Sequence, residues 1–345
     1  MKHVQWQDVS VINRTFDYNS KRIVFAIVIF IALQSAASAA QRYTVRRPVT
    51  PPPSVVEQDP LSEESPRDPQ CGIHWETNYE SALKSAKESR RSLLVYFESA
   101  QASPDANAAC GRFNDTALKD FRIASELDKY VLVKVQNVSE TALVPAESEA
   151  TPLEESVLPT EAVPDFSELE SNPGLVLVEF EDTEAAYYGQ TVAVLPFLNG
   201  ESPTPEETLT FLTLPPGTLT QRTMIYAVRI HPHQPLGATG FPNPVTSAVA
   251  TEQAEYQAER GILGHQNYGQ RSSQALDALG GGSPSEICAQ SRPGIGLFEG
   301  ALSCMHAWRN SSAHWNFLRR EHRCFGFDIR RSKNGTWFST GFFVD

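Results

Sequence analysis

Three residues that lie far apart in this sequence, His265, Glu286 and His314, are its strongest candidates for a shared chemical site. Two imidazoles and one carboxylate form a ligand set that suits a divalent ion such as zinc and leaves a fourth position for water or substrate. Alternatively, Glu286 is a general base that acts on a bound water. A third interpretation is purely structural, because histidines that hydrogen-bond each other or a carboxylate also fix a fold.

Thiol chemistry is a second possibility, because the sequence contains five cysteines. An odd number leaves at least one cysteine without a disulfide partner. We expect Cys304 to pair with Cys324, because the first lies on an expected helix and the second enters an expected strand of the same domain. Cys110 is the candidate for redox chemistry. The sequence shows no phosphate-binding glycine loop and no paired Cys-x-x-Cys zinc motif.

The segments that lead up to residue 215 alternate helices with apolar strands. The expected elements are a helix opened by a capping box at Thr77 and Glu80, strands at 92–97 and 130–135 with helical segments at 108–127 between them, strands at 174–180 and 190–195, and a helix opened by Thr204, Pro205 and Glu207. Alternation of this kind predicts an α/β fold with some parallel pairing. The last two strands are expected to form an antiparallel pair.

The C-terminal third contains the elements that would position the three candidate site residues. They are a helix at 245–260 that ends at Gly261 just before His265, a glycine-rich stretch at 280–282 before Glu286, a helix at 301–308, a helix that begins at Ser311 and carries His314, and a hairpin around Asn334-Gly335. The helices follow from apolar periodicity and from their start and stop signals. The hairpin follows because Asn-Gly is the strongest short-range hairpin signal.

Residues 71–215 resemble the thioredoxin fold, and in particular the secreted thioredoxin-like proteins that carry a Cys-x-x-Cys motif. Pro173 stands where that family has its cis-proline, and residues 107–110, Asn-Ala-Ala-Cys, stand at the motif. Only the second cysteine of the motif, Cys110, is present. Dithiol exchange needs a second thiol to resolve the mixed disulfide. The resemblance therefore implies a redox-inactive domain, with a monothiol redox protein acting through Cys110 as an alternative.

Residues 223–345 resemble the CAP superfamily, also called the SCP-like or cysteine-rich secretory protein family. The resemblance is carried by four motifs in order, Gly264-His265, Ser285-Glu286-Ile287, the run from Trp308 to His314, and the run from Asn334 to Phe338. It implies a three-layer α/β/α sandwich with His265, Glu286 and His314 in one open cleft. The family's second glutamate, shortly after the tryptophan, is replaced here by Arg309, Asn310 and Ser311. Without that second glutamate, the case for metal binding and the case for hydrolysis are both weaker.

The N-terminal residues indicate export. Residues 1–40 are predicted to be a signal peptide, because the apolar run 23–33 follows two basic residues and precedes small residues. An uncleaved anchor formed by residues 23–40 is the alternative. Residues 41–70 are predicted to be a disordered, proline-rich linker, and residues 139–165 an acidic, proline-rich insert in the first domain.

The formal net charge of −12 argues against non-specific nucleic-acid binding, which needs Lys and Arg to replace phosphate counterions. The charge is unevenly distributed. No Lys or Arg occurs between Lys134 and Arg222, whereas basic residues are frequent from Arg309 to Lys333. The basic end is either a solvated surface or a surface that meets an anionic polymer or the protein's own acidic segment.

The sequence thus predicts an α/β protein with a thioredoxin-like domain followed by a CAP-type α/β/α sandwich. The leading functional hypothesis is an exported, non-catalytic protein whose cleft binds a cell-surface partner, a polymer or a small molecule. The first alternative is a zinc-dependent hydrolase that uses His265, His314 and Glu286. The second is the monothiol redox protein. Two other histidines, His306 and His322, are expected at the surface.

Overall fold

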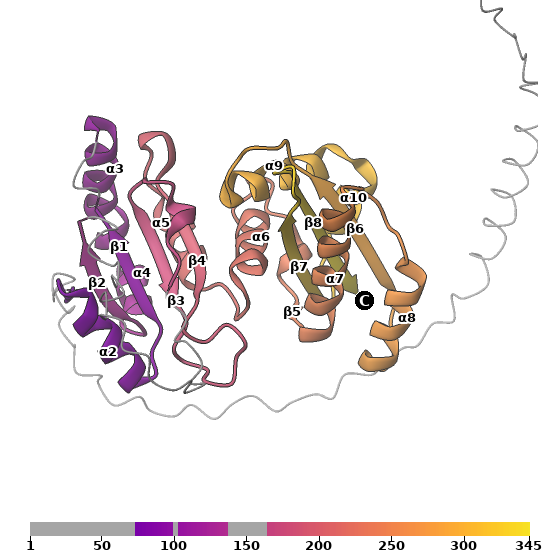
Figure 1. Cartoon of the computed structure of the whole chain (residues 1–345), viewed down its shortest axis with the longest axis horizontal. Helices are drawn as coiled ribbons and strands as arrows, with labels where there is room; N and C mark the ends of the chain where they lie inside the picture. The colour runs from indigo at the N-terminus through magenta and orange to yellow at the C-terminus, as the bar shows by residue number, and fades with distance from the viewer. Residues whose placement is uncertain (1–72, 99–102, 137–163) are drawn as a thin grey trace, which may run out of the picture. The chain divides into compact units, whose positions relative to one another are not determined.

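A computed structural model of the chain describes residues 73–98, 103–136 and 164–345 (Figure 1). All of them belong to one compact unit, Ser65–Asp345, which contains two four-stranded sheets. The fold is mixed α/β, as the sequence predicts. The predicted signal peptide, the predicted linker and nearly all of the predicted acidic insert lie outside the described residues.

The first sheet has the strand order β2-β1-β3-β4. Its elements are α2 (Tyr79–Ser89), β1 (Leu93–Phe97), α3 (Pro104–Asp115), α4 (Phe121–Leu127), β2 (Val131–Val135), β3 (Gly174–Val178), β4 (Thr191–Pro196) and α5 (Pro205–Leu212), with short 3-10 turns at Ala117–Lys119, Ser167–Leu169 and Leu198–Gly200. Strand β1 pairs with β2 in parallel, and β3 pairs antiparallel with both β1 and β4. Both predicted kinds of pairing are confirmed. The strands are almost wholly apolar because both faces of the sheet are covered.

Two details of the first sheet differ from the expectations. Helix α2 is capped by Asn78, whose side chain accepts from the Ser81 N–H at 2.8 Å, so the predicted Thr77–Glu80 capping box is wrong. Asparagine is at least as good an N-cap as threonine, and it stands one residue closer to the helix. Second, no peptide bond among the described residues is cis, so Pro173 lacks the cis form that the thioredoxin resemblance implies. The capping box at Thr204 is present as predicted.

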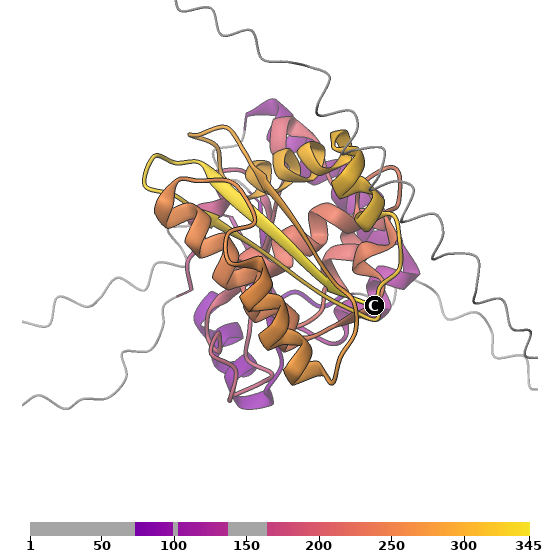
Figure 2. The same cartoon turned by 90° about the vertical axis from the view of Figure 1, so that its right-hand side faces the viewer.

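The second sheet has the strand order β5-β7-β8-β6. Its elements are α6 (Leu219–Arg229), a 3-10 turn at Leu236–Ala238, β5 (Phe241–Pro242), α7 (Pro244–Arg260), α8 (Tyr268–Leu279), β6 (Pro284–Gln290), α9 (Leu297–Asn310), α10 (Ser312–Leu318), β7 (Cys324–Arg331) and β8 (Trp337–Val344). Helix α7 packs on β7 and β8, and in Figure 2 an orange helix runs alongside the yellow strands. Helices α6 and α9 contact the strands from the other side, which gives three layers.

Alternate residues of β7 face the two helical layers. Phe325 and Phe327 belong to the core cluster that includes α6 and α9, whereas Gly326 faces α7 so closely that a Cβ there would lie 2.2 Å from the backbone of Ser247. The hairpin between β7 and β8 is formed as predicted. Its turn is held by Asn334, whose Oδ1 accepts from the Thr336 N–H at 3.1 Å.

The predicted disulfide between Cys304 and Cys324 is wrong, because both are buried free thiols. Cys304 on α9 belongs to the core cluster that includes Trp308, while Cys324 packs with Val249 of α7 in a separate cluster on the opposite face of the sheet. A disulfide needs Cα atoms within about 7 Å of each other. The sheet itself therefore separates the two thiols.

The main core cluster contains residues of both sheets. Leu195 of β4 belongs to the same cluster as Met224 of α6 and Phe327 of β7. Helix α6 contacts β4 as well as β7, so its apolar residues are buried on more than one side. Within residues 73–98, 103–136 and 164–345, no helix is both long enough and apolar enough to span a bilayer.

Candidate functional site

His265 is positioned by two buried glutamines of the preceding helix α7. That helix ends at Gly261, which has the left-handed conformation of a C-cap. The side chain of Gln253 donates to the Gly264 carbonyl at 2.6 Å, and the side chain of Gln257 accepts from the Gly264 N–H at 3.1 Å. These bonds fix the short loop after α7, so His265 has a defined place although its side chain is 46 % exposed.

Glu286, on edge strand β6, is the buried centre of the site. One carboxylate oxygen lies 2.9 Å from Nδ1 of His265, and the other lies 2.7 Å from a terminal nitrogen of Arg271 on α8. The side chains of Glu286 and Arg271 are only 1 % and 3 % exposed. Arg271 also donates to the Gln266 carbonyl. Both oxygens of the carboxylate are therefore engaged within the protein.

The bond to Glu286 fixes the tautomer of His265. An ionised carboxylate can only accept hydrogen bonds, so Nδ1 of the imidazole carries the proton. The other ring nitrogen, Nε2, forms no bond with a described residue. When the ring is neutral, Nε2 keeps its lone pair, and His265 then offers a hydrogen-bond acceptor to whatever enters the cleft.

His314 completes the predicted set. It lies on α10, whose N-cap Ser311 receives the His314 N–H at 3.5 Å, and its ring centroid is 6.1 Å from that of His265. Burial lowers the pKa of His314 below its ordinary value, and the neighbouring His265 lowers it further. The structure thus brings all three predicted residues together, with His314 next to His265 and without a bond to Glu286.

Cys288 is a site residue that the sequence analysis did not place. Its Sγ lies 3.7 Å from Nδ1 of His265 and 3.8 Å from Glu286. Burial and the negative charge of Glu286 raise the pKa of this thiol far above its ordinary value, so it stays protonated at neutral pH. Donor atoms of His265, Glu286 and Cys288 lie within 4.8 Å of one another, a spacing that could hold a metal ion.

The charges around these donor atoms suit a cation poorly. Arg271 already neutralises Glu286 at 2.7 Å, and a metal ion on the same carboxylate would be repelled by the guanidinium. Metal binding by Cys288 requires the thiolate, which burial and Glu286 both disfavour. Nδ1 of His265 carries a proton while it is bonded to Glu286. We therefore derive no chemical step through a metal at this group.

A cavity of about 280 Å³ opens beside the histidine. Its walls are His265, Tyr268, Pro284, Ser285, Glu286 and Phe317. The Tyr268 hydroxyl donates to the Pro284 carbonyl at 2.7 Å, so this ring is held in place. The cavity therefore combines two aromatic walls with the accessible edge of an imidazole.

Arg271 was missed because it lies between motifs, not within one. The sequence does contain a signal for it. Arg271 follows Tyr268 by three residues and precedes Ala275 by four, which places it on the buried face of amphipathic helix α8. An arginine on such a face needs an anionic partner, and Glu286 is the glutamate on the neighbouring strand.

Cys110 lies away from this cleft, on α3 of the first sheet. It is the seventh residue of that helix, is only 8 % exposed, and packs in the same cluster as Tyr96 and Phe113. Burial, and secondarily Cys110, raises the pKa of the Tyr96 hydroxyl. A reactive thiol is normally accessible and close to a helix N-terminus. The position of Cys110 is instead that of a core residue.

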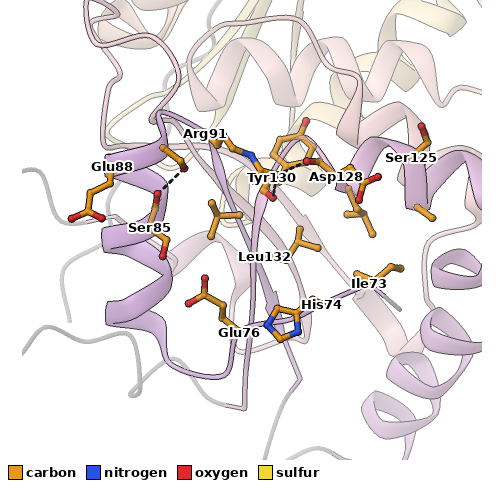
Figure 3. A pocket seen from close by; sticks show the side chains of 14 residues that line it. Ile73, His74, Glu76, Ser85, Glu88, Arg91, Ser125, Asp128, Tyr130 and Leu132 are labelled. Carbon is orange, nitrogen blue, oxygen red and sulfur yellow. Dashed lines mark hydrogen bonds between the residues drawn. The ribbon is translucent and has the colours of Figure 1, made fainter. Parts of the chain in front are cut away.

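A larger cavity, of about 910 Å³, lies at the edge strand β2 (Figure 3). Figure 3 shows Glu76 and His74 on one side and Arg91 with its bond to Tyr130 on the other. Arg91 also donates to the carbonyls of Lys129 and Asp128, and the backbone of Glu76 is bonded to β2. Arg91 and the backbone of Glu76 are thus engaged in supporting the chain around β2.

Comparison with family models, with curated proteins and with solved structures finds no match to this chain. The resemblances to the CAP superfamily and to the thioredoxin fold therefore stay predictions that rest on the motifs.

Proposed function

We propose that this chain is an exported ligand-binding protein in which the cleft beside His265 binds a small molecule without turning it over. The observation that carries the proposal is that both carboxylate oxygens of Glu286 already have hydrogen-bond partners within the protein. One oxygen is bonded to His265 and the other to Arg271. The first sheet is proposed to be a redox-inactive support.

A hydrolase would need a free general base and access for water. Glu286 is 1 % exposed, and a water would have to displace His265 or Arg271 to reach its oxygens. The nearest potential nucleophile, Cys288, is held protonated by its surroundings. The residues that could act chemically are thus already bonded to one another, which favours binding over catalysis.

The ligand class follows from the groups that remain accessible. Nε2 of a neutral His265 is an acceptor, and Tyr268 and Phe317 provide aromatic walls. The charges of Glu286 and Arg271 cancel, so the floor of the cleft attracts neither a strong anion nor a strong cation. We infer that the ligand is uncharged, that it is apolar over most of its surface, and that it carries one hydroxyl or N–H donor.

The arrangement of the sheets supports the proposed domain assignments. A four-stranded sheet in the order β2-β1-β3-β4, with one parallel and two antiparallel pairs, agrees with a thioredoxin-like first half. Helices on both faces of the second sheet agree with a CAP-like α/β/α sandwich. Export is proposed from the apolar run and the small residues near the N-terminus alone.

The zinc-dependent hydrolase is the second candidate function, and the spacing of His265, Glu286 and Cys288 is the observation in its favour. Its weakness is the Arg271–Glu286 ion pair. The monothiol redox protein is less well supported, because Cys110 is buried in the core of the first sheet.

The test is a titration of the full-length protein with p-cresol, a small aromatic hydroxyl compound, followed by NMR. We expect saturable shifts of the His265 ring signals, and a loss of binding in His265→Ala and Phe317→Ala. His306→Ala, an exposed histidine outside the cleft, is the matched control and should bind p-cresol normally. Equal binding by wild type and His265→Ala would contradict the proposed ligand contact.

Hydrolase activity is tested separately with ester, peptide and glycan substrates, with and without zinc. The proposal expects no zinc-dependent turnover by the wild type. Turnover that needs zinc and disappears in both His265→Ala and Glu286→Gln variants of checked fold would replace the binding protein with the hydrolase.

A further inference from the structure

A second cavity on the C-terminal half has the lining of a peptide groove. It measures about 790 Å³ and lies where the start of α7 meets the N-terminal end of α6 and the loop before β4. Two aromatic rings, Tyr187 and Phe241, line it together with Pro216, Pro242 and Pro244. We call these five residues the aromatic groove. None of them belongs to the cleft at His265.

Phe241 is the most informative residue of the groove. Its side chain is large and apolar, yet it is 64 % exposed. Its backbone is fixed, because its N–H donates to the Arg323 carbonyl at 3.2 Å and the Asn243 N–H donates to the Phe325 carbonyl at 3.1 Å. A large aromatic side chain that is left exposed on a fixed backbone beside an apolar groove marks a recognition surface.

Part of the lining of the groove is acidic. Glu252 and Glu255 lie on consecutive turns of α7 and line the groove. Glu255 is 3.4 Å from Arg330, whereas Glu252 forms no ion pair with a described residue. The groove therefore offers one uncompensated negative charge beside its aromatic rings, and a partner with a basic residue complements it.

Tyr187 adds a polar group to the apolar floor. Its side chain is half-buried, and its hydroxyl forms no hydrogen bond with a described residue. A tyrosine hydroxyl carries its proton at neutral pH and can donate it to a hydrogen bond, and burial raises the pKa of this one further. A ligand with an unbonded carbonyl group can accept a hydrogen bond from this hydroxyl.

We propose that the aromatic groove binds an extended, proline-rich peptide that carries arginine or lysine next to its prolines. Such peptides adopt the polyproline II conformation, which leaves their carbonyls unbonded and is already ordered before binding. Proline rings pack well on aromatic side chains, and grooves of this composition recognise that conformation. The basic residue of the peptide contacts Glu252, and Tyr187 donates to a peptide carbonyl.

Fluorescence polarisation with a labelled synthetic peptide, Arg-Arg-Pro-Leu-Pro-Pro-Leu-Pro, tests the proposal on the full-length protein. Phe241→Ala should weaken binding about tenfold, because central aromatic residues dominate such contacts. Phe121→Ala is the matched control, since Phe121 is 73 % exposed and lies outside the groove. It should bind like the wild type.

The charge contact is tested with a second pair of variants on the same helix. Glu252→Gln should weaken binding about threefold at low salt and should reduce the dependence of affinity on salt. Glu259→Gln, also exposed on α7 but outside the groove, should change neither. Tyr187→Phe, which removes only a hydroxyl, keeps the test informative if Phe241→Ala does not fold, and it should also weaken binding.

Three results would overturn the proposal. The first is an absence of binding at peptide concentrations up to about 1 mM, where even weak recognition is detectable. The second is equal loss of affinity in Phe241→Ala and Phe121→Ala. The third is undiminished binding of a peptide in which every proline is replaced by alanine, because the groove would then recognise apolar material of any conformation.

Discussion

The buried ion pair between Arg271 and Glu286 is the strongest energetic constraint at the residue scale. Each side chain is almost completely buried, so each depends on the other for compensation of its charge. Removing one partner of such a pair leaves an uncompensated charge in a medium of low dielectric constant, whereas removing both charges costs much less.

We therefore expect strong coupling between substitutions at this pair. Arg271→Met alone should destabilise the protein by about 3–5 kcal/mol, and the double variant Arg271→Met with Glu286→Gln should lose less than the sum of the two single variants. Urea unfolding of the four proteins measures the coupling. Additive losses would mean that solvent, not Glu286, compensates Arg271.

His314 should make stability depend on pH. Its pKa in the folded protein is lowered, so in mildly acid solution the unfolded chain binds a proton that the folded protein does not. Stability should fall as the pH drops below about 6.5, the ordinary value for histidine. His314→Gln should reduce this slope between pH 7 and pH 5, while His306→Gln should retain it. Thermal melts across the range provide the measurement.

The sequence predicts site residues well where a family motif includes them and poorly elsewhere. His265, Glu286 and His314 meet as expected. Arg271 reaches the site only through the packing of α8 on β6, whereas Cys288 reaches it because it lies two residues after Glu286 on the same face of β6. His322 shows the same limit. It was expected at the surface, yet it is buried, bonded to Asp345 at 2.6 Å and stacked on Phe343. Nothing in the sequence around His322 indicates that Asp345 is its partner.

At the scale of elements, helix α9 begins without a side-chain cap of its own, because Gly296 is its N-cap. The missing acceptor comes from a distant segment. Glu168, in the turn before β3, accepts from the Leu297 N–H at 3.0 Å. Burial raises the pKa of Glu168, although the bond to Leu297 opposes that shift. A helix of the second sheet is therefore capped by a residue that precedes it by more than a hundred positions.

Two substitutions of Glu168 distinguish the effect of its hydrogen bond to Leu297 from the effect of its ionisation. Glu168→Ala should cost about 1 kcal/mol, the usual loss for a missing N-cap acceptor. Glu168→Gln keeps a hydrogen-bond acceptor for the Leu297 N–H but has no ionisable carboxyl group. Because the folded pKa is raised, the folded protein binds more protons than the unfolded chain, so the wild type should lose stability relative to Glu168→Gln as the pH rises through the carboxyl range. Chemical denaturation at pH 4 and pH 7 compares the three proteins.

Two of the element predictions that succeed rest on local signals. The capping box at Thr204 and the hairpin at Asn334-Gly335 are encoded within four or five residues, and both are present. The predicted disulfide failed because it required knowledge of which face of the sheet each thiol occupies. Spacing along the chain does not contain that information, since neighbouring residues of a strand point to opposite faces.

At the scale of the whole molecule, the two sheets share one main core cluster. The sequence divides the chain into domains at 71–215 and 223–345, but apolar residues of α6 lie in the same cluster as residues of β4 and β7. Apolar surface that two parts of a protein bury against each other couples their stabilities, because unfolding one part exposes apolar surface of the other part to water.

We therefore expect a single cooperative unfolding transition. Leu195→Ala, a core change on β4, should destabilise the protein by about 2–5 kcal/mol and should shift the transition of both halves together. Far-ultraviolet circular dichroism follows the whole chain, and the fluorescence of Trp308 reports the second sheet in a variant that lacks the other tryptophans. Separate midpoints for the two signals would show that the halves unfold independently.

The turn between β7 and β8 also has a consequence for the chemical ageing of the protein. Asn-Gly sequences deamidate when the glycine nitrogen attacks the asparagine side chain and closes a five-membered imide. Here the Gly335 N–H is bonded to the Ser332 carbonyl at 2.9 Å, and Oδ1 of Asn334 is bonded to Ser332 and Thr336. The folded turn therefore withholds the attacking atom. Isoaspartate at Asn334 would accumulate mainly while the hairpin is open, so its amount in an old sample records how long the molecules have spent unfolded.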